Sequence, residues 1–217
     1  MREFKFNNLG TFSEFGCVLK PGYTIGEPLA KTNYVSIPGC NSALDLSEVL
    51  AGEILYDNRE FNASLMILPT WTNRYEMVTK LRNYLHGKRM KMQDPDDPKS
   101  YYLGRFSVGA IEQDGKIWSL SISGNLEPYK YRNEVTIKSY KMATSTLDIV
   151  LKNSRKKVIP SITVSATTQL IFAGITVSLT AGTYRNSNIF LSEGDNPITI
   201  KAPVNTTIKF EYQEGDL

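Results

Sequence analysis

The sequence predicts a mostly β protein of two domains, with one α-helix in the first. Short runs rich in Val, Ile, Thr and aromatic residues, separated by turn residues, recur along the 217 residues. Convincing helical periodicity occurs in only one stretch, which ends near Leu85. Beyond Arg132–Asn133 the helical pattern is absent, so we expect a domain at 1–132 and another at 133–217.

The helix is expected to begin at Thr72 or Asn73 and to end near Leu85. Asn73 and Glu76 have the spacing of a capping box, in which each side chain bonds the other's backbone. Gly87 can adopt the left-handed conformation that ends many helices. One apolar stripe at helical spacing consists of Val78, Leu81 and Leu85.

Strands and hairpins account for the rest of the first domain. A turn rich in Pro and Asp splits the hairpin at 88–105, which we expect to protrude and to offer edge strands to a neighbouring molecule. Asp114–Gly115 suits a second hairpin with a type I′ turn. The expected strands are Phe4–Phe6, Tyr34–Ile37, Arg59–Ile67, Lys88–Gln93, Tyr101–Ile111 and Ile117–Ser123.

The second domain reads as a small β-sandwich. Its runs are short, and turn residues separate many of them at intervals near the roughly 8–12 residues typical of that fold. The expected strands are Val135–Lys138, Ser161–Ser165, Gln169–Phe172, Ile175–Leu179, Ile189–Leu191, Pro197–Lys201 and Thr207–Tyr212.

Charge and hydropathy limit the function. The formal net charge is +3, with neither domain strongly basic, so nucleic acid is not an expected partner. The one basic triplet, Arg155–Lys157, is interpreted as a solvated turn between strands. The N-terminal residues do not resemble a signal peptide, and no apolar run approaches the ~18 residues needed to span a bilayer.

Catalytic chemistry has little support in the sequence. Any histidine-dependent relay must use His86, the single histidine, which we instead expect to end the helix. Asp94, Asp96 and Asp97 are interpreted as a solvated hairpin tip, with cation binding as the alternative. We therefore predict a protein that is not an enzyme, with no catalytic residues, no cofactor and no metal site.

Three carboxylates, two cysteines and several aromatic residues remain as candidates for chemistry or binding. Glu112, Asp114 and Glu127 suggest no defensible acid–base pair. Cys17 and Cys40 are interpreted as free thiols, with a 17–40 disulfide as the alternative. The following aromatics are interpreted as core or interface anchors, with sugar stacking as the alternative: Tyr101, Tyr102, Trp118, Tyr129 and Tyr131. Phe172, Tyr184 and Phe190 are too few to indicate a lectin site.

An ordered series of segments resembles the distal tail proteins of siphophages, including prophage tail proteins of Gram-positive bacteria. The series consists of Phe4–Asn8 with Phe15–Gly16, Ile37–Leu46, Tyr56–Phe61, Leu85–Gly87 leading to Asp97–Arg105, Pro128–Lys130 and Leu191–Asn196. Cys40-Asn-Ser departs from the family pattern, which has a basic residue followed by a glycine, and so puts any contact made by that loop's charge in doubt.

The resemblance implies a structural protein of the virion. In that family an N-terminal β-sandwich with one helix and a protruding hairpin forms a hexameric ring, and a galectin-like or carbohydrate-module-like sandwich follows it. The ring is a hub between the tail tube protein and the tip or baseplate, which carries the tail-associated and receptor-binding proteins. The resemblance thus places this chain at a phage or prophage tail tip, assembled in the host cytoplasm and involved in host attachment. The alternative is a carbohydrate-binding tail module that contacts the host cell wall.

Overall fold

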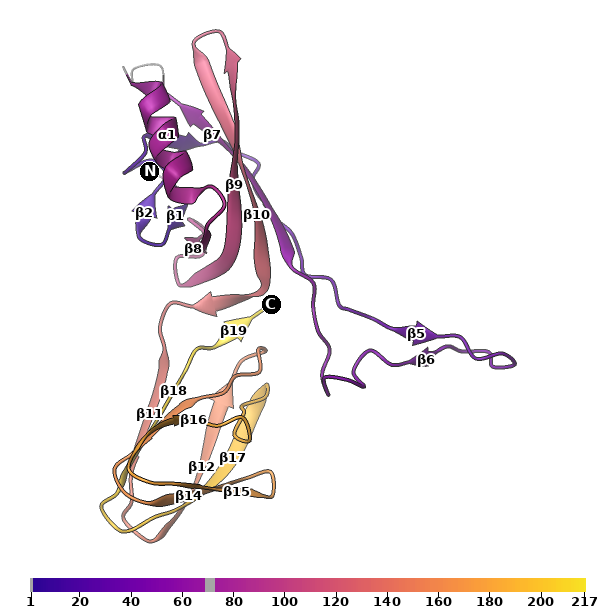
Figure 1. Cartoon of the computed structure of the whole chain (residues 1–217), viewed down its shortest axis with the longest axis vertical. Helices are drawn as coiled ribbons and strands as arrows, with labels where there is room; N and C mark the ends of the chain where they lie inside the picture. The colour runs from indigo at the N-terminus through magenta and orange to yellow at the C-terminus, as the bar shows by residue number, and fades with distance from the viewer. Residues whose placement is uncertain (1, 69–72) are drawn as a thin grey trace. The chain divides into compact units, whose positions relative to one another are not determined.

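The computed structural model describes residues 2–68 and 73–217, which divide into two compact units, 1–130 and 131–217. Strands dominate both units, and each unit has its own hydrophobic core. Within the described ranges α1 is the single α-helix, as predicted (Figure 1). The mostly β fold class is therefore confirmed.

Unit 1 is built on one antiparallel sheet in the order β2-β1-β8-β9-β10-β7-β3, with β4 also paired to β7. Its longest strands are β9 and β10, which are neighbours in the middle of the sheet (Figure 1). The strands of this sheet are β1 (Lys5–Phe6), β2 (Leu9–Gly10), β3 (Cys17–Leu19), β4 (Thr24–Ile25), β7 (Arg59–Ile67), β8 (Arg89–Gln93), β9 (Ser100–Asp114) and β10 (Ile117–Arg132).

The helix α1 (Arg74–Leu85) buries the predicted stripe, because Val78, Leu81 and Leu85 all enter the core of unit 1. The capping box is not formed. Asn73 is the N-cap residue without a side-chain capping bond, and its Nδ2 instead donates to Glu76 Oε2 at 3.2 Å. Thr72, the other expected cap, lies outside the described residues. Gly87 has φ +74°, as the C-terminal prediction requires.

Phenylalanines from distant segments fill the core of unit 1. The rings of Phe4 and Phe61 meet edge to face with centroids 5.1 Å apart, and those of Phe6 and Phe106 do so at 4.9 Å. Gly124 lies against them, and a Cβ added there would come within 2.7 Å of the Phe106 ring. The absence of a side chain at Gly124 thus makes room for the aromatic cluster.

The β9–β10 hairpin continues further than the sequence predicted, since each strand runs unbroken through the whole region. Its turn also differs in type. Gly115 occupies the first loop position with φ +55°, whereas Lys116 does not have a positive φ. One positive φ at the first loop position is the pattern of a type II′ turn, so the expected type I′ turn was wrong.

Unit 2 contains the predicted β-sandwich, with sheets in the orders β11-β18-β13-β16 and β12-β17-β14-β15. Its strands are β11 (Thr136–Lys141), β12 (Thr146–Asn153), β13 (Ser161–Val164), β14 (Thr168–Phe172), β15 (Ile175–Leu179), β16 (Gly182–Arg185), β17 (Gly194–Lys201), β18 (Thr207–Tyr212) and the short β19 (Gly215–Asp216). Neither β12 nor β16 was predicted.

The strand expected at 189–191 is not present. Ile189 and Leu191 are fully buried, but the chain there makes only an isolated bridge, between Leu191 and Val158. The apolar run reflects burial of a connecting segment in the sandwich core and not membership of a sheet.

The described residues include no helix long and apolar enough to cross a membrane.

Candidate functional site

An extended arm, residues 27–58, leaves the sheet of unit 1 between β4 and β7 (Figure 1). Strands β5 (Tyr34–Val35) and β6 (Leu44–Asp45) pair only with each other. Nearer the sheet, Lys31 N donates to Leu55 O and Asp57 N donates to Leu29 O, both at 2.8 Å. The arm is therefore a long two-stranded excursion with its own backbone ladder. It is the protruding hairpin of this protein, where the sequence had suggested residues 88–105.

Apolar side chains cover this arm without entering a core. Leu50 is fully exposed, and Val49 and Tyr34 are 68% and 60% exposed. The exposed large hydrophobic residues of the arm are Leu29, Tyr34, Val35, Ile37, Leu44, Val49, Leu50 and Leu55. Exposed apolar surface of this kind, concentrated on one segment, is typical of a surface that a partner covers.

The arm is also acidic. Residues 27–58 contain five acidic residues and one basic residue, Lys31, a net charge of −4. The other residues of unit 1, 1–26 and 59–130, contain fourteen basic and ten acidic residues, a net charge of +4. The arm and the body of unit 1 thus carry equal and opposite charge, which favours contact between the arm of one molecule and the body of another.

The guanidinium of Arg59 holds the root of the arm. Arg59 is only 4% exposed; its Nε donates to Pro128 O at 2.7 Å, and its Nη1 donates to Gly26 O at 3.4 Å. The Glu27 carboxylate lies 3.5 Å from the same Nη1, and the guanidinium carbon is 5.6 Å from the centre of the Tyr102 ring. Arg59 directly follows the last residue of the arm and contacts Gly26 and Glu27, where the arm begins. It therefore links both ends of the arm to Pro128 of β10.

The hairpin tip at Asp94–Pro98 does not protrude, because its carboxylates are tied to the same unit. Tyr23 donates its hydroxyl hydrogen bond towards Asp94 and Asp96, with both O···O distances 2.7 Å, and Arg2 forms an ion pair with Asp96. Lys130 Nζ lies 3.3 Å from Asp97 Oδ2. Strand β8 is also paired on both sides, with β1 and β9. The expectation that this hairpin offers free edges to a neighbour was wrong.

Hydrogen bonds and burial shift the pKa values in this cluster. Burial, followed by the hydrogen bonds to Asp94 and Asp96, raises the pKa of Tyr23 well above its usual value. The hydrogen bond from Tyr23, together with Arg2, holds the pKa of Asp96 below its usual range. These directions describe an ionised Asp96 beside a neutral Tyr23. Among the described residues, no group of three or more His, Cys, Asp or Glu side chains is placed to hold a metal ion.

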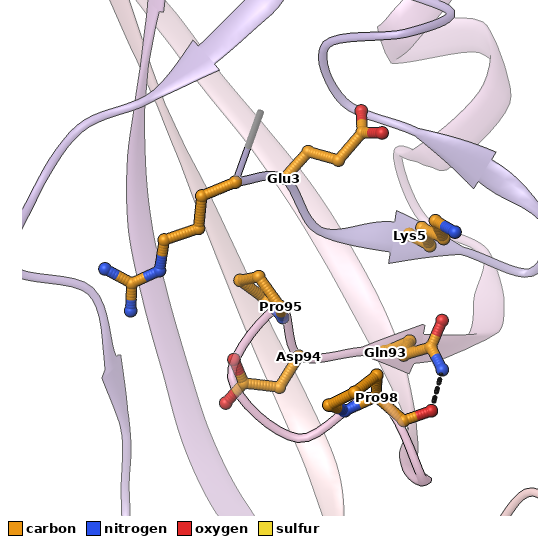
Figure 2. A pocket seen from close by; sticks show the side chains of 7 residues that line it. Glu3, Lys5, Gln93, Asp94, Pro95 and Pro98 are labelled. Carbon is orange, nitrogen blue, oxygen red and sulfur yellow. Dashed lines mark hydrogen bonds between the residues drawn. The ribbon is translucent and has the colours of Figure 1, made fainter.

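A pocket of about 340 Å³ lies between this tip and β1 (Figure 2). Figure 2 shows Glu3 pointing away from Asp94, and its carboxylate accepts hydrogen bonds from the backbone nitrogens of Phe12 and Ser13, both at 2.8 Å. Gln93 Nε2 donates to Pro98 O at 2.5 Å. The carboxylate of Glu3 and the amide of Gln93 thus stabilise the local fold by bonding to backbone groups. They form no nucleophile–base pair.

His86 is the C-cap residue of α1, where the sequence placed it. Its Nδ1 accepts a hydrogen bond from Val108 N at 3.0 Å, so the imidazole joins the helix end to β9. Cys17 is buried, Cys40 is exposed, and both are free. Burial raises the pKa of the Cys17 thiol to about 11, and Cys40 is the solvent-accessible cysteine of the two.

The aromatic residues singled out in the sequence do not form one face. Tyr101 and Tyr102 are nearly buried, with Lys91 Nζ 4.4 Å from the Tyr101 ring centre and Arg59 beside Tyr102. The remaining three make separate contacts: Trp118 with Tyr75, Tyr129 with Tyr56, and Tyr131 with Lys156. They serve as packing anchors, as the first interpretation had it.

The aromatic and basic residues of unit 2 are likewise engaged in packing. Phe172 belongs to the core, and Phe190 packs against it beneath Lys157 Nζ, 4.2 Å from the ring centre. The Tyr184 hydroxyl lies 2.8 Å from Thr180 Oγ1. The basic triplet forms a turn between strands, but its three cations contact Glu193, Tyr131 and Phe190, so it is less solvated than expected.

No family model matches the sequence, and no curated protein is similar to it in sequence. Among solved structures, the fold is similar to that of a protein of the phage adsorption apparatus. It is the Dit protein (gp 19.1) of SPP1, described as a paradigm of the hub adsorption apparatus in phages that infect Gram-positive bacteria. The TM-score is 0.68 and the identity 13%, over 98% of this chain and 99% of that one. At this identity the likeness establishes a shared fold.

Proposed function

We propose that this chain is a structural distal tail protein of a phage or prophage. It forms a hexameric ring that serves as the hub between the tail tube and the tip or baseplate. The observation that carries this proposal is the fold likeness to SPP1 Dit along nearly the whole of both chains. The ordered sequence segments that resemble distal tail proteins support it independently, because they do not depend on the three-dimensional structure.

The arm provides a physical basis for assembly. A ring of identical subunits needs one surface on each copy to meet a different surface on the next, and a sixfold ring closes when each contact rotates the neighbour by about one sixth of a turn. The exposed apolar residues of the arm supply the first surface. The opposite charges of arm and body favour a contact between copies over a contact between two arms.

The proposed place of the protein follows from this role. The ring sits at the virion tail tip, is assembled in the cytoplasm of the bacterial host, and contacts the tail tube protein, a tail-associated tip protein and the receptor-binding protein. Its role is structural and not catalytic, and it requires no cofactor.

Electron microscopy and light scattering of the purified chain test the proposal directly. Annular particles with sixfold symmetry and a mass near six chains of 24.4 kDa are the expected result. A protein that remains monomeric at every concentration tested, with no annular particles, contradicts it.

The carbohydrate-binding alternative gains no specific support from unit 2. Of the aromatics considered for stacking, Phe172 and Phe190 pack in or on the core, and Tyr184 is partly buried. Binding of unit 2 to cell-wall glycans on an array would restore this alternative, and absence of binding is expected.

A further inference from the structure

A heterologous ring contact needs a second surface, different from the arm, on the body of each unit 1. Among the described residues of unit 1, large hydrophobic side chains that are exposed outside the arm occur at Tyr75 and Ile117. Tyr75 is on the first turn of α1, and Ile117 is the first residue of β10. Tyr75, the more exposed of the two at 67%, marks where a neighbouring arm can bury apolar surface.

Tyr75 belongs to a connected cluster, here called the Tyr75 patch: Arg74, Tyr75, Lys116 and Trp118. Side chains of β10 alternate between the two faces of the sheet, so Ile117 lies on the face opposite to Trp118. The Tyr75 and Trp118 rings meet edge to face with centroids 4.7 Å apart, and the Arg74 guanidinium carbon lies 5.0 Å from the Trp118 ring centre. Arg74 Nη1 also donates to Lys116 O at 3.0 Å, which ties the helix to the β9–β10 turn.

This composition and rigidity suit a binding surface. Tyr, Trp and Arg are the residues that most often dominate the energy of protein interfaces. The ring stacking and the Arg74 hydrogen bond hold the patch in one arrangement, so a partner orders few side chains when it binds.

One part of the arm complements the patch. Val49 and Leu50 are among its most exposed apolar residues, and Glu48 and Glu53 flank them. The patch offers the exposed Tyr75 ring together with the cations of Arg74 and Lys116. A contact between this part of the arm and the patch would bring apolar side chains together and place two carboxylates near two cations.

We propose that segment 48–53 of one copy covers the Tyr75 patch of the next copy in the ring. The inference rests on the proposed ring function and adds the identity of the receiving surface. It also accounts for the exposure of large apolar side chains at two separate places on unit 1, because the contact buries both.

Cross-linking locates the receiving surface. In a chain carrying Cys40→Ser and Ala51→Cys, the thiol introduced at position 51 is the accessible one, because Cys17 is buried. A benzophenone maleimide is attached there, and the assembled protein is irradiated and then digested with trypsin. The label is expected to join segment 48–53 to peptides containing Tyr75 or Trp118 of another copy. Cross-links confined to other peptides overturn the proposal.

Substitution gives a second, independent readout. Tyr75→Glu should raise the protein concentration needed for assembly at least about tenfold, since it removes apolar contact and repels the acidic arm. Asn83→Glu adds the same charge at an exposed site on the same helix and should leave assembly unchanged. Thermal unfolding of each variant monitors the fold.

The outcomes separate the two proposals. If the unsubstituted chain forms no ring, the proposed function and this inference both fail. If it forms a ring, and the Tyr75→Glu variant assembles as before with cross-links elsewhere, the Tyr75 patch is not the receiving surface and the ring function stands.

Discussion

At the residue scale, Arg59 connects the arm to the body of unit 1. A buried guanidinium is stable only when hydrogen bonds replace its hydration, and here backbone carbonyls supply most of them. Its Nη2 has no hydrogen-bond partner among the described residues. The carboxylate nearest to it, Glu27, is exposed, so the charge of Arg59 is held mainly by Pro128 O, Gly26 O and the Tyr102 ring.

Replacing Arg59 with alanine should lower the free energy of unfolding of unit 1 by about 2–4 kcal/mol, because its hydrogen bonds to two partly buried carbonyl groups are lost and a buried side chain is removed. Urea unfolding followed by circular dichroism measures the change. Arg2→Ala is the matched control: its ion pair with Asp96 is exposed, so its loss should lower the stability much less than the loss of Arg59. Equal effects of the two substitutions would show that Arg59 does not anchor the root.

Glu3 provides a prediction of pH dependence. Burial tends to raise the pKa of Glu3, but the backbone hydrogen bonds from Ser13 and Phe12 outweigh it and lower the pKa below the ordinary value of 4.5. A carboxyl with a lowered folded-state pKa stabilises the fold above its unfolded-state pKa, and that stabilisation is lost as the pH falls through the folded-state value. Glu3→Gln should therefore be less stable than the unsubstituted chain at pH 7, with the gap narrowing below about pH 4.5.

Melting temperatures measured between pH 7 and pH 3 test this expectation. A stability gap that stays constant down to pH 3 would show that the hydrogen bonds to Phe12 and Ser13 do not depend on the carboxylate charge.

At the scale of the elements, the hairpin that protrudes in the structure is the arm, and not the hairpin at 88–105 that the sequence suggested. The hairpin of β8 and β9 has a strand of its own unit on each edge, β1 and β10, whereas the arm of β5 and β6 contributes nothing to the core cluster of unit 1. A segment that is absent from the core and rich in exposed apolar side chains is better suited to contact another molecule than to stabilise its own.

Replacing residues 32–54 with a short Gly/Ser linker should leave the stability of unit 1 within about 1 kcal/mol, since no side chain of the arm belongs to the core. The same change should abolish the ring. Light scattering gives the mass, and urea unfolding gives the stability. A ring that persists without the arm would contradict its role in assembly.

Deleting Asp94–Lys99 is the matching control for the other hairpin. It should lower stability, because the contacts with Tyr23, Arg2 and Lys130 are lost, yet leave the mass of the assembly unchanged. A loss of the ring in this variant would return the hairpin tip to the interface.

At the scale of the whole molecule, the chain consists of two units with separate cores, and their division lies between residues 130 and 131. Tyr131 and Arg132 are held by unit 2. Lys156 Nζ donates to the Tyr131 hydroxyl at 2.6 Å, and Arg132 Nη1 lies 3.0 Å from Glu214 Oε2. Glu214 is nearly buried and also accepts hydrogen bonds from Thr136 and Ser154.

The fragment 131–217 should therefore fold by itself and be more stable than the fragment 133–217 by about 1–3 kcal/mol, because removal of Arg132 leaves the nearly buried Glu214 without its cation. Circular dichroism and urea unfolding of both fragments test this. Equal stability would place the division at 132–133, where the change of sequence pattern suggested it.

Sequence alone determined the β-rich class, the single helix with its buried stripe, the C-terminal sandwich and the absence of a recognisable catalytic motif. These follow from local periodicity, which a chain carries whatever its tertiary contacts. Even β12 had its signal, since Leu147, Ile149 and Leu151 alternate with exposed residues, although it was not predicted. The ordered motifs likewise indicated the tail-protein resemblance without any tertiary information.

Only the tertiary structure decided which hairpin projects, what holds the root of the arm and where exposed apolar surface gathers. Each depends on residues far apart in the chain: Tyr23 binds Asp94 across 71 positions, and Arg59 binds Pro128 across 69. Both hairpins show turn residues between short strand-like runs, so their sequences do not distinguish a free arm from a bound one. That distinction depends on which polar groups find partners within the fold, and pairing across such distances has no signature in local periodicity.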